Sequence, residues 1–509
     1  MPSTSQHGPG AELEIKLALP TADPASLARQ LARLPALARR KPVRKQVDNI
    51  YFDTPAQALR AQRMALRLRR VGGDDAPQWL QTFKTSDGGD SALSLRGEWE
   101  VPVPGPALVQ AALQAAPPWQ RLDPEGAVFA ALQPCFATAF ERTAWTVRRR
   151  DGSVIEVALD LGQITSGQRS VPICELELEL LAGAPTALFD LARQIALYIA
   201  VLPLAASKAQ RGHALRDGTL DTPLRARPQP LGGDVAWHHM VQPVLGEMFA
   251  QFTANLNALR HCDDPELVHQ ARVGWRRFRS ALRLFKPAVP AQALPSWQGL
   301  QPLLIALGEL RDLDVACTQT LPALQDAFVA GHAGRAERWQ AMEQAFQQAA
   351  LQQRQRVRQA LQEPPVGAAL LAITLWLDEL ARPEAWGAQD ISGKAVRRWV
   401  RQRMVRLHAQ WKKALRDSTH AESQHRARIL AKRLRYNIEA LCPLLPARTQ
   451  RWLQQVSGVQ AGIGASRDLL QAGVLAQRLA VDRGIVAFLR GYAAGRAGVP
   501  WASQLPGSV

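Results

Sequence analysis

The amino-acid sequence predicts an α+β fold, in which a closed β-sheet with a charged interior and outer helices is followed by an all-helical part. Two observations lead to this prediction. Charged and apolar residues alternate along several segments in the N-terminal part of the chain. Beyond about residue 235 the strand patterns end, and Ala, Leu, Gln and Arg dominate the sequence.

The alternation is clearest in the segments Glu12–Lys16, Leu66–Arg69 and Glu175–Leu180. Because successive side chains of a strand point to opposite faces, each segment would have one apolar face and one charged face. Several such strands suggest a closed sheet whose apolar faces pack against outer helices and whose charged faces line one cavity. Carboxylates and cations gathered in one cavity suit a polyanion that is held with a divalent metal ion.

Eight segments of the N-terminal part have strand patterns, namely residues 11–19, 44–52, 64–71, 78–84, 94–103, 136–149, 153–161 and 171–180. Four segments have helix patterns, namely residues 24–33, 106–115, 124–133 and 185–199. Asp151-Gly152 is predicted to join two long strands as a hairpin. Residues 217–234 are rich in Pro and Gly and are predicted to form a linker, so the first domain would span residues 11–216.

The helical part, predicted to span residues 235–500, contains an internal repeat. The segment His269–Arg279 matches His425–Arg435, which lies 156 residues further on, and Arg311-Asp312 matches Arg467-Asp468 at the same offset. Two independent matches at one offset predict two tandem helical bundles, at about residues 235–390 and 391–500.

Each copy of the repeat carries basic residues and one His at helical spacing, so that they form a stripe. Like charges three or four positions apart repel one another. The stripe therefore needs a partner, which is either an internal carboxylate such as Asp312, Asp314 or Asp468 or an external polyanion. Its occurrence in both copies favours a binding surface. The residues of the two stripes are His269, Arg272, Arg276, Arg279, His425, Arg428, Lys432 and Arg435.

The composition limits the partners and the compartment. The 509 residues are too many for a single core, and the formal net charge of +18 points to nucleic acid, an anionic membrane or polyphosphate. The five cysteines form no CxxC pair, which excludes a zinc ribbon or a disulfide framework and fits a reducing cytosol. No apolar stretch reaches transmembrane length without interruption, and residues 1–10 lack the features of a signal peptide. We therefore expect a cytoplasmic protein that does not bind membranes.

Several catalytic motifs are missing from the sequence. It has no Walker A loop, no GxGxxG segment, no G-x-S-x-G elbow and no Cys–His pair. Metal-assisted hydrolysis is therefore favoured over covalent catalysis. Lys208 would open a helix that could close one mouth of the cavity.

The N-terminal motifs resemble the CYTH superfamily, the triphosphate tunnel metalloenzymes. Glu12–Lys16 looks like the ExExK motif of these enzymes. Four later segments resemble further blocks of the domain in the right order, namely Asn49–Pro55, Leu66–Arg69, Thr82–Lys84 and Ile173–Leu180. The last block especially resembles that of bacterial inorganic triphosphatases. The helical part resembles the CHAD domain, a conserved-histidine helical module associated with polyphosphate.

The resemblance implies an eight-stranded antiparallel β tunnel that cleaves triphosphates with Mg²⁺ or Mn²⁺. Phosphate oxygens would be held by Lys16, Arg67, Arg69, Lys84, Arg142 and Lys208. Metal or the attacking water would be held by Glu12, Glu14, Glu98, Asp160, Glu175, Glu177 and Glu179. The expected catalytic residues are Glu12, Glu14, Lys16 and Lys84, and the two stripes of the helical part would bind polyphosphate.

The function expected from these residues is the hydrolysis of tripolyphosphate to pyrophosphate and phosphate in the tunnel, with long-chain polyphosphate bound by the helical domain. One alternative is a non-catalytic polyphosphate-binding scaffold. Another is a thiamine triphosphatase or adenylate cyclase of the same fold, although no base-reading feature argues for a cyclase. Nucleic acid is not an expected partner, because the stripes lack the interleaved aromatic residues that stack on single strands.

Overall fold

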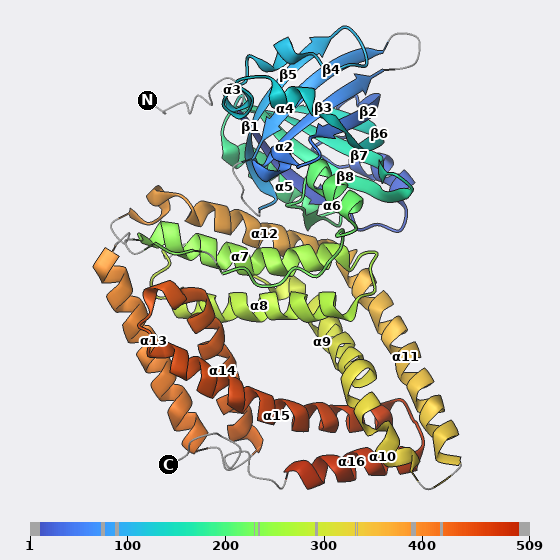
Figure 1. Ribbon diagram of the computed structural model, residues 1–509, viewed down its shortest axis with the longest axis vertical. Coiled ribbons are helices and arrows are strands. Elements are labelled where there is room, and N and C mark those ends of the chain that lie inside the picture. Colours follow the sequence, from blue (N-terminus) through green and yellow to red (C-terminus); the bar gives the residue numbers. More distant parts are fainter. Residues whose placement is uncertain are drawn as a thin grey trace. The chain divides into compact units, whose positions relative to one another are not determined.

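The computed structural model describes residues 11–72, 77–86, 91–228, 230–232, 235–290, 294–330, 332, 334–387, 393–417 and 421–497 (Figure 1). They form two compact units. The first unit holds the residues up to Thr222 together with Pro295–Leu300 and Leu361–Trp376, and the second holds Pro223–Leu294, Gln301–Ala360 and the residues from Leu377 on. Of the predicted linker and the predicted end of the helical domain, residues 229, 233, 234 and 498–500 lie outside the described ranges.

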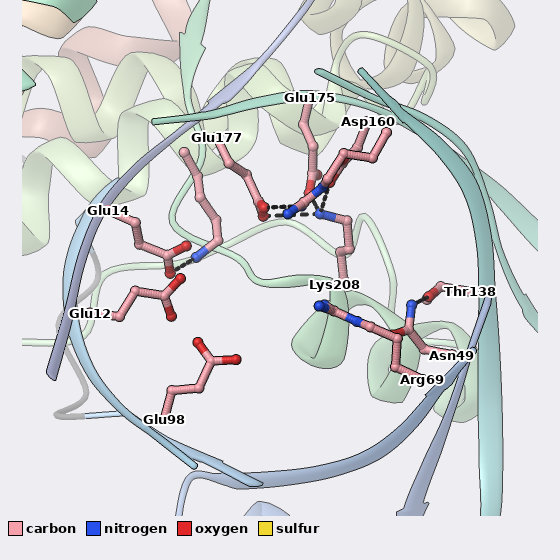
Figure 2. A network of polar contacts seen from close by, with 12 residues as sticks. Glu12, Glu14, Asn49, Arg69, Glu98, Thr138, Asp160, Glu175, Glu177 and Lys208 are labelled. Atoms are coloured by element: carbon pink, nitrogen blue, oxygen red, sulfur yellow. Dashed lines mark hydrogen bonds and ion pairs between the residues drawn. The ribbon is translucent and has the colours of Figure 1, made fainter. Parts of the chain in front are cut away.

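The first unit is built on one antiparallel sheet. Its strands are β1 (Ala11–Ala18), β2 (Val43–Asp53), β3 (Met64–Val71), β4 (Gln78–Thr85), β5 (Leu93–Val103), β6 (Gln133–Arg148), β7 (Val154–Ser166), β8 (Arg169–Ala182) and the short β9 (Leu202–Pro203). They follow the order β5-β4-β3-β2-β6-β7-β8-β1-β9. Strand β1 also pairs with β5, with Ala11–Ile15 opposite Leu93–Gly97, so eight strands close into a ring (Figure 2). The predicted fold class is confirmed.

The alternation of the sequence decides which side chains face outward from this ring. Leu13, Ile15 and Leu17 of β1 are buried in one core with the apolar residues of β7 and β8. Helices α1 (Leu27–Ala32) and α5 (Pro185–Ala196) pack into the same core. Burying one such aliphatic side chain contributes about 1.5–3 kcal/mol. The charged residues between them are therefore directed to the inside of the ring.

The other part of the ring has a smaller outer core. Leu66 and Phe83 pack there with Trp119 of α3 (Pro117–Leu122) and Leu59 of α2 (Ala58–Ala61). The predicted helix at 106–115 is present only as the 3₁₀ turn η2 (Gln110–Leu113), and that at 124–133 only as α4 (Ala127–Ala130). The short helices α2 and α3 and strand β9 were not predicted. They are two to six residues long, too short to show a periodic pattern.

Helix α6 (Lys208–Asp217) begins with a capping box, in which Ser207 accepts a hydrogen bond from the backbone of Gln210 and the Gln210 side chain bonds back to Ser207. It ends at Gly218, whose φ of 69° lies in the left-handed region. A Cβ at Gly212 would lie 2.1 Å from the ring of Phe136. The glycine thus allows α6 to pack closely on β6.

The second unit is helical. It contains α7 (Trp237–Ala258), α8 (Pro265–Phe285), α9 (Gln301–Val315), α10 (Gln325–Val329), α11 (Gly334–Leu361), α13 (Gly393–Arg416), α14 (Ala421–Leu441), α15 (Thr449–Arg478) and α16 (Arg483–Ala497), apart from the last residue of α11. Helix α12 (Pro364–Leu380) lies in the first unit up to Trp376. Helices α13 and α14 begin 156 residues after α7 and α8. The helix boundaries therefore follow the sequence repeat.

The two copies of the repeat share a core. Leu313 and Trp339 of the first copy pack in one cluster with Leu469, Leu475 and Leu489 of the second. Helix α8 contacts α14, and α9 contacts α15. The equivalent basic helices of the two copies are consequently neighbours.

None of the five cysteines forms a disulfide. Within the described ranges, no single helix has both the length and the hydropathy needed to cross a membrane. The bent pair Gly334–Leu361 and Pro364–Leu380 meets those two criteria by length and composition only.

We predict that Gly212→Ala destabilises the first unit. Alanine favours a helix over glycine by about 1 kcal/mol, but overpacking a well-packed site costs about 1–3 kcal/mol or more, and the contact with Phe136 is far below van der Waals distance. Thermal unfolding should therefore begin at a lower temperature. The control is Gly105→Ala, because a Cβ there meets no atom within 4 Å. Equal unfolding temperatures for the two variants would contradict this packing.

Candidate functional site

The ring encloses a cavity of about 630 Å³ that is lined mainly by charged side chains. Figure 2 shows carboxylates and basic groups pointing into it from different strands and from α6. Eleven of the residues expected from the sequence line this cavity: Glu12, Glu14, Lys16, Arg67, Arg69, Lys84, Glu98, Arg142, Glu177, Glu179 and Lys208. Asp160 and Glu175 do not line it, because they are buried behind the basic groups with which they pair.

One group of carboxylates lies around Lys84. Its Nζ atom is 2.8 Å from Glu12 Oε2 and 2.8 Å from Glu98 Oε2. Burial opposes ionisation of Glu98, but Lys84 and the nearby Arg67 lower its pKa to about 2. Burial and the like charge of Glu12 raise the pKa of Glu179 to about 8. Carboxylates thus outnumber cations in this part of the cavity.

Glu14 and Lys16 form an ion pair on the inner face of β1, and both side chains are buried. Ser94 of the neighbouring β5 donates a hydrogen bond from Oγ to Glu14 Oε1 at 3.0 Å. Period-two alternation along β1 places Glu12, Glu14 and Lys16 on the same face of the strand. The ExExK segment therefore brings two carboxylates and one ammonium into the cavity.

A second group of carboxylates holds the basic residues Arg142 and Lys208. Arg142 donates from Nε and Nη2 to the two oxygens of Asp160, each at 2.7 Å, and lies 2.5 Å from Glu177. Lys208 Nζ lies 2.7 Å from Asp160 and 2.9 Å from Glu177, and it also pairs with Glu175. Burial opposes ionisation of Glu177, but Lys208 and Arg142 hold its pKa well below the usual value. Asp160, Glu175 and Glu177 could hold a metal ion by their spacing, yet the ammonium of Lys208 lies among them here.

Two arginines of β3 form the third feature of the cavity. Arg69 donates from Nε to Asn49 Oδ1 at 3.0 Å, and Asn49 in turn donates to Thr138 at 2.8 Å. Arg67 lies 3.6 Å from Glu98. Burial and the like charge of Arg67 lower the pKa of Arg69 to about 10, so both guanidinium groups are charged at neutral pH. Arg69 and Arg67 also lie 3.4 Å and 3.9 Å from Glu100. Two adjacent cations that share one carboxylate favour a further anionic ligand.

The donor atoms fit a hard divalent cation. The cavity offers carboxylate oxygens, and Met64 is the sulfur-containing residue among the described lining residues. Mg²⁺ and Mn²⁺ prefer oxygen ligands. Burial, followed by the like charges of Glu12 and Glu98, raises the pKa of Glu179. A divalent ion bound by these three carboxylates would offset their like charges.

Several lining residues were missed by the sequence analysis. Glu156 lies on the same face of β7 as Asp160, so extending the period-two pattern would have found it. Arg211, which supports the site without lining the cavity, follows Lys208 by about one turn of α6 and pairs with Glu175. Arg60 and Arg63 line the cavity from the connection between β2 and β3, where no periodic signal exists. Burial and the nearby Arg60 lower the pKa of His213 to about 4, so this lining residue is neutral at pH 7.

The second unit carries a separate cationic surface on α8, α9, α14 and α15. The basic groups that are close enough there to interact electrostatically are Arg272, Arg276, Arg311, Arg428, Lys432 and Arg467. The accompanying carboxylates are Asp312 and Asp468, and Asp314 and Glu266 also act on Arg311. Within the described ranges none of these six cations has an ion pair within 4.0 Å. Burial, followed by Arg276 and Arg428, lowers the pKa of Lys432 to about 7.

The structure gathers only part of the two predicted stripes on this cationic surface. Burial and Arg311 lower the pKa of His269 to about 4, which places it beside the surface as a neutral group. Arg279 interacts with Arg283 instead, and Arg435 is paired with Glu439 at 2.7 Å. His425 is exposed at the start of α14. Arg311 and Arg467 join the surface, although the sequence analysis used them only as markers of the repeat.

Comparisons with known proteins agree with both resemblances. Residues 10–213 match the family model of the CYTH domain, and residues 243–477 match that of the CHAD domain. The chain therefore carries a CYTH domain followed by a CHAD domain. An inorganic triphosphatase of Haemophilus influenzae is 33% identical over 205 residues, which make up 40% of this chain and 54% of the relative. The chain thus spans about half the length of this curated relative.

Two solved structures are also similar to parts of the chain. The CHAD domain from the plant Ricinus communis is 31% identical with a TM-score of 0.46, over 54% of this chain and 91% of that one. A putative adenylyl cyclase from Hippeastrum, described as having a dominant triphosphatase activity, is 22% identical with a TM-score of 0.31. This similarity covers 41% of this chain and 97% of that one.

We predict that Lys208→Met lowers the free energy of unfolding by about 3–5 kcal/mol, because it leaves buried carboxylates without one of their counter-charges. Urea unfolding of the full chain would measure the loss. Added Mg²⁺ should restore part of it, since Asp160, Glu175 and Glu177 lie close enough to share a cation. Lys41→Met is the control, because Lys41 is exposed. A loss no larger than that of Lys41→Met would disprove the supporting role of Lys208.

Proposed function

We propose that the tunnel domain, residues 11–216, hydrolyses inorganic triphosphate to pyrophosphate and phosphate with Mg²⁺ or Mn²⁺, and that the helical domain, residues 235–500, binds long-chain polyphosphate. The observation that carries the first part is the closed ring with clustered arginines and clustered carboxylates inside one cavity. The inorganic triphosphatase relative over the CYTH residues supports the same reaction.

The basic side chains of the cavity are suited to bind a triphosphate. Arg67 and Arg69 carry like charges, and burial together with the charge of Arg67 lowers the pKa of Arg69. A phosphate group placed between them would remove this repulsion and accept hydrogen bonds from both guanidinium groups. Arg142 and Lys208 are fixed from behind by Asp160. The proposed phosphate ligands are therefore Arg67, Arg69, Arg142 and Lys208, with Lys16 and Lys84 beside the carboxylates.

The carboxylates proposed to hold metal at the reacting phosphate are Glu12, Glu14, Glu98 and Glu179. A bound Mg²⁺ or Mn²⁺ would neutralise phosphate charge and lower the pKa of a bound water. Lys84 pairs with Glu12 and Glu98 and lowers the pKa of Glu98, so that the ionised Glu98 can act as a metal ligand. Asp160, Glu175 and Glu177 were expected to bind metal as well. Their contacts with Lys208 and Arg142 favour a supporting role for Asp160 and Glu175.

The lining of the cavity favours inorganic triphosphate over a nucleotide or thiamine triphosphate. The ring side chains among the described lining residues are Tyr51 and His213. Tyr51 is stacked on Phe136 with 4.6 Å between ring centroids, and His213 packs edge-on against the same ring. Neither ring is therefore well placed to sandwich an organic base. Cleavage of tripolyphosphate in preference to ATP and thiamine triphosphate would distinguish these substrates.

The cationic surface of the second unit supports polyphosphate binding by the helical domain. Six cations lie there near fewer carboxylates, and the Nε atoms of Arg276 and Arg428 are buried without a hydrogen-bond partner. An excess of half-buried cations favours an external anion that offsets their repulsion. We place the protein in the cytoplasm, which fits five cysteines without a disulfide.

We predict that Glu14→Gln reduces turnover of tripolyphosphate by on the order of a hundredfold, because it removes a charge proposed to hold metal. Phosphate release would be measured with Mg²⁺ and with a chelator. Glu141→Gln is the matched control, since Glu141 is exposed and alternates with Arg142 on β6. Near-normal turnover by a folded Glu14→Gln protein would reject the metal assignment.

We further predict that the combined change of Arg272, Arg276, Arg428 and Lys432 to Gln weakens binding of long-chain polyphosphate and leaves tripolyphosphate turnover nearly unchanged. Each hydrogen bond to a charged group contributes about 1.5–3 kcal/mol, so affinity should fall by several orders of magnitude. Calorimetric titration of the full chain would show this. Unaltered polyphosphate affinity would mean that the cationic surface serves another partner.

The affinity for polyphosphate should also fall as the pH rises through about 7. The ammonium of Lys432 has a pKa of about 7 without ligand, and a bound polyanion would raise that pKa, so the protonated form binds more tightly. Lys432 is influenced by Arg272 and Arg276 on α8, Arg428 on its own helix and Arg467 on α15. Lys432→Arg, which copies the residue of the first repeat, should abolish this decline, because arginine remains charged. The same pH dependence in this variant would contradict the assignment to Lys432.

A further inference from the structure

A second cavity of about 430 Å³ adjoins the tunnel cavity, and we refer to it as the outer cavity. Arg142 and Glu156 line both cavities, so the two spaces share a wall. The basic residues that line the outer cavity are Arg39, Arg40, Lys41, Lys45, Arg142 and Arg148. The outer cavity is not used by the reaction proposed for the tunnel.

The strand register shows that the outer cavity continues the inner face of the ring. Lys45 of β2 lies opposite Arg142 of β6. Arg148 lies an even number of residues after Arg142 on β6, so both side chains are on the same face. Six residues of strand span about 20 Å at about 3.3 Å per residue. The basic lining therefore extends from Arg142 to the end of β6.

The charges of the outer cavity are not balanced. Among the described residues that line the outer cavity, Glu156 carries a carboxylate and six residues carry basic groups. Arg142 is already bound to Asp160 and Glu177. Within the described part of the chain, Arg39, Lys45 and Arg148 have no ion pair within 4.0 Å. An anionic ligand would balance these charges.

The basic groups are held next to one another by the backbone. Arg40 donates from Nε to the carbonyl oxygen of Ala36 at 3.1 Å and from Nη2 to that of Arg148 at 3.3 Å. The second bond ties the segment that carries Arg39 and Lys41 to the end of β6. The cations thus come from two strands and one connection that are linked to each other.

We propose that the outer cavity is a second phosphate-binding site, which takes the phosphates of a linear polyphosphate beyond the three held in the tunnel. The inference rests on the proposed function, since it assumes that the tunnel holds a triphosphate. Arg142 contacts the tunnel cavity and the outer cavity alike, so a phosphate chain that reaches it can continue toward Lys45 and Arg148. The site would make chains longer than tripolyphosphate better bound substrates.

The lining of the outer cavity also favours a phosphate chain over the organic groups that other triphosphates carry. Apart from the charged residues, it consists of Val43, Ala144 and Thr146. The described lining contains no aromatic ring on which a nucleobase or a thiazolium group could stack. A lining of basic groups without an aromatic ring fits an inorganic polyphosphate, because every phosphate of the chain carries charge.

The test compares two double variants with the same loss of charge. Lys45→Gln with Arg148→Gln removes cations of the outer cavity. Arg44→Gln with Arg150→Gln removes two exposed cations that do not line it. Phosphate release from tripolyphosphate and from tetrapolyphosphate would be measured with the full chain. Unfolding temperatures of both variants would show that each one is folded.

We expect Lys45→Gln with Arg148→Gln to raise the KM for tetrapolyphosphate by about tenfold relative to that for tripolyphosphate, the effect of one lost contact to a charged group. The kcat values and the control variant should change little. Equal KM changes for the two substrates, or the same change in the control, would overturn the inference. Weaker inhibition by inorganic phosphate without altered length preference would also overturn it, because the site would then hold the product.

A binding measurement separates this inference from the proposed function. In a chelator, and with Arg272, Arg276, Arg428 and Lys432 changed to Gln to silence the cationic surface, tetrapolyphosphate should bind more tightly than tripolyphosphate. The difference should vanish when Lys45→Gln and Arg148→Gln are added. A length preference without any hydrolysis would reject only the proposed function, whereas hydrolysis without a length preference would reject only the outer site.

Discussion

The buried ion cluster around Lys208 is the interaction on which the tunnel depends. It joins α6 to β7 and β8 through Asp160, Glu175 and Glu177, and Arg142 of β6 is bound to the same carboxylates. Taking such charges out of water is costly, and the cost is offset only when each charge has several partners. Asp160 meets this condition, because it accepts two hydrogen bonds from Arg142 and one from Lys208. The cluster thereby fixes a cationic wall at one side of the cavity.

The opposite side of the cavity is not balanced in the same way. Glu12 and Glu98 share the ammonium of Lys84, and burial and Glu12 raise the pKa of the nearby Glu179 to about 8. A short distance away, Arg67 and Arg69 carry like charges and share Glu100 as a counter-charge. The ring thus holds a group of carboxylates and a pair of guanidinium groups near each other. A divalent cation and a polyphosphate together would satisfy both, which is why the charge pattern points to this pair of ligands.

The strand positions of the site could be predicted from the sequence because a strand leaves only two directions for a side chain. Once Glu12, Glu14 and Lys16 are assigned to one face, the closure of the ring directs that face inward. The sequence could not distinguish Glu177, which lines the cavity, from Glu175, which is buried behind it. That difference depends on Lys208 and Arg211 of α6, which arrive from a helix about 30 residues further along the chain.

Prediction was less complete where no period constrains the side chains. Arg60 and Arg63 reach the cavity from a connection, and the two short helices beside β3 and β4 have no repeating apolar face. In the helical part the spacing correctly grouped Arg272 with Arg276 and Arg428 with Lys432. It also included Arg435, which is bound to Glu439 one turn later. A helical stripe spans several directions, so contacts with neighbouring helices decide which of its residues share a surface.

The cations of the two domains differ in how they are paired with carboxylates, and this difference affects which ligands each domain selects. In the tunnel the cations are paired with buried carboxylates, so a ligand must replace those contacts with equally good ones. On the cationic surface the six cations outnumber the nearby carboxylates, so almost any polyanion lowers the repulsion. Charges near a surface are screened over about 8–10 Å at physiological ionic strength, whereas buried pairs are screened much less. The helical domain is therefore suited to salt-sensitive capture of long polyanions, and the tunnel to selection among triphosphates by geometry.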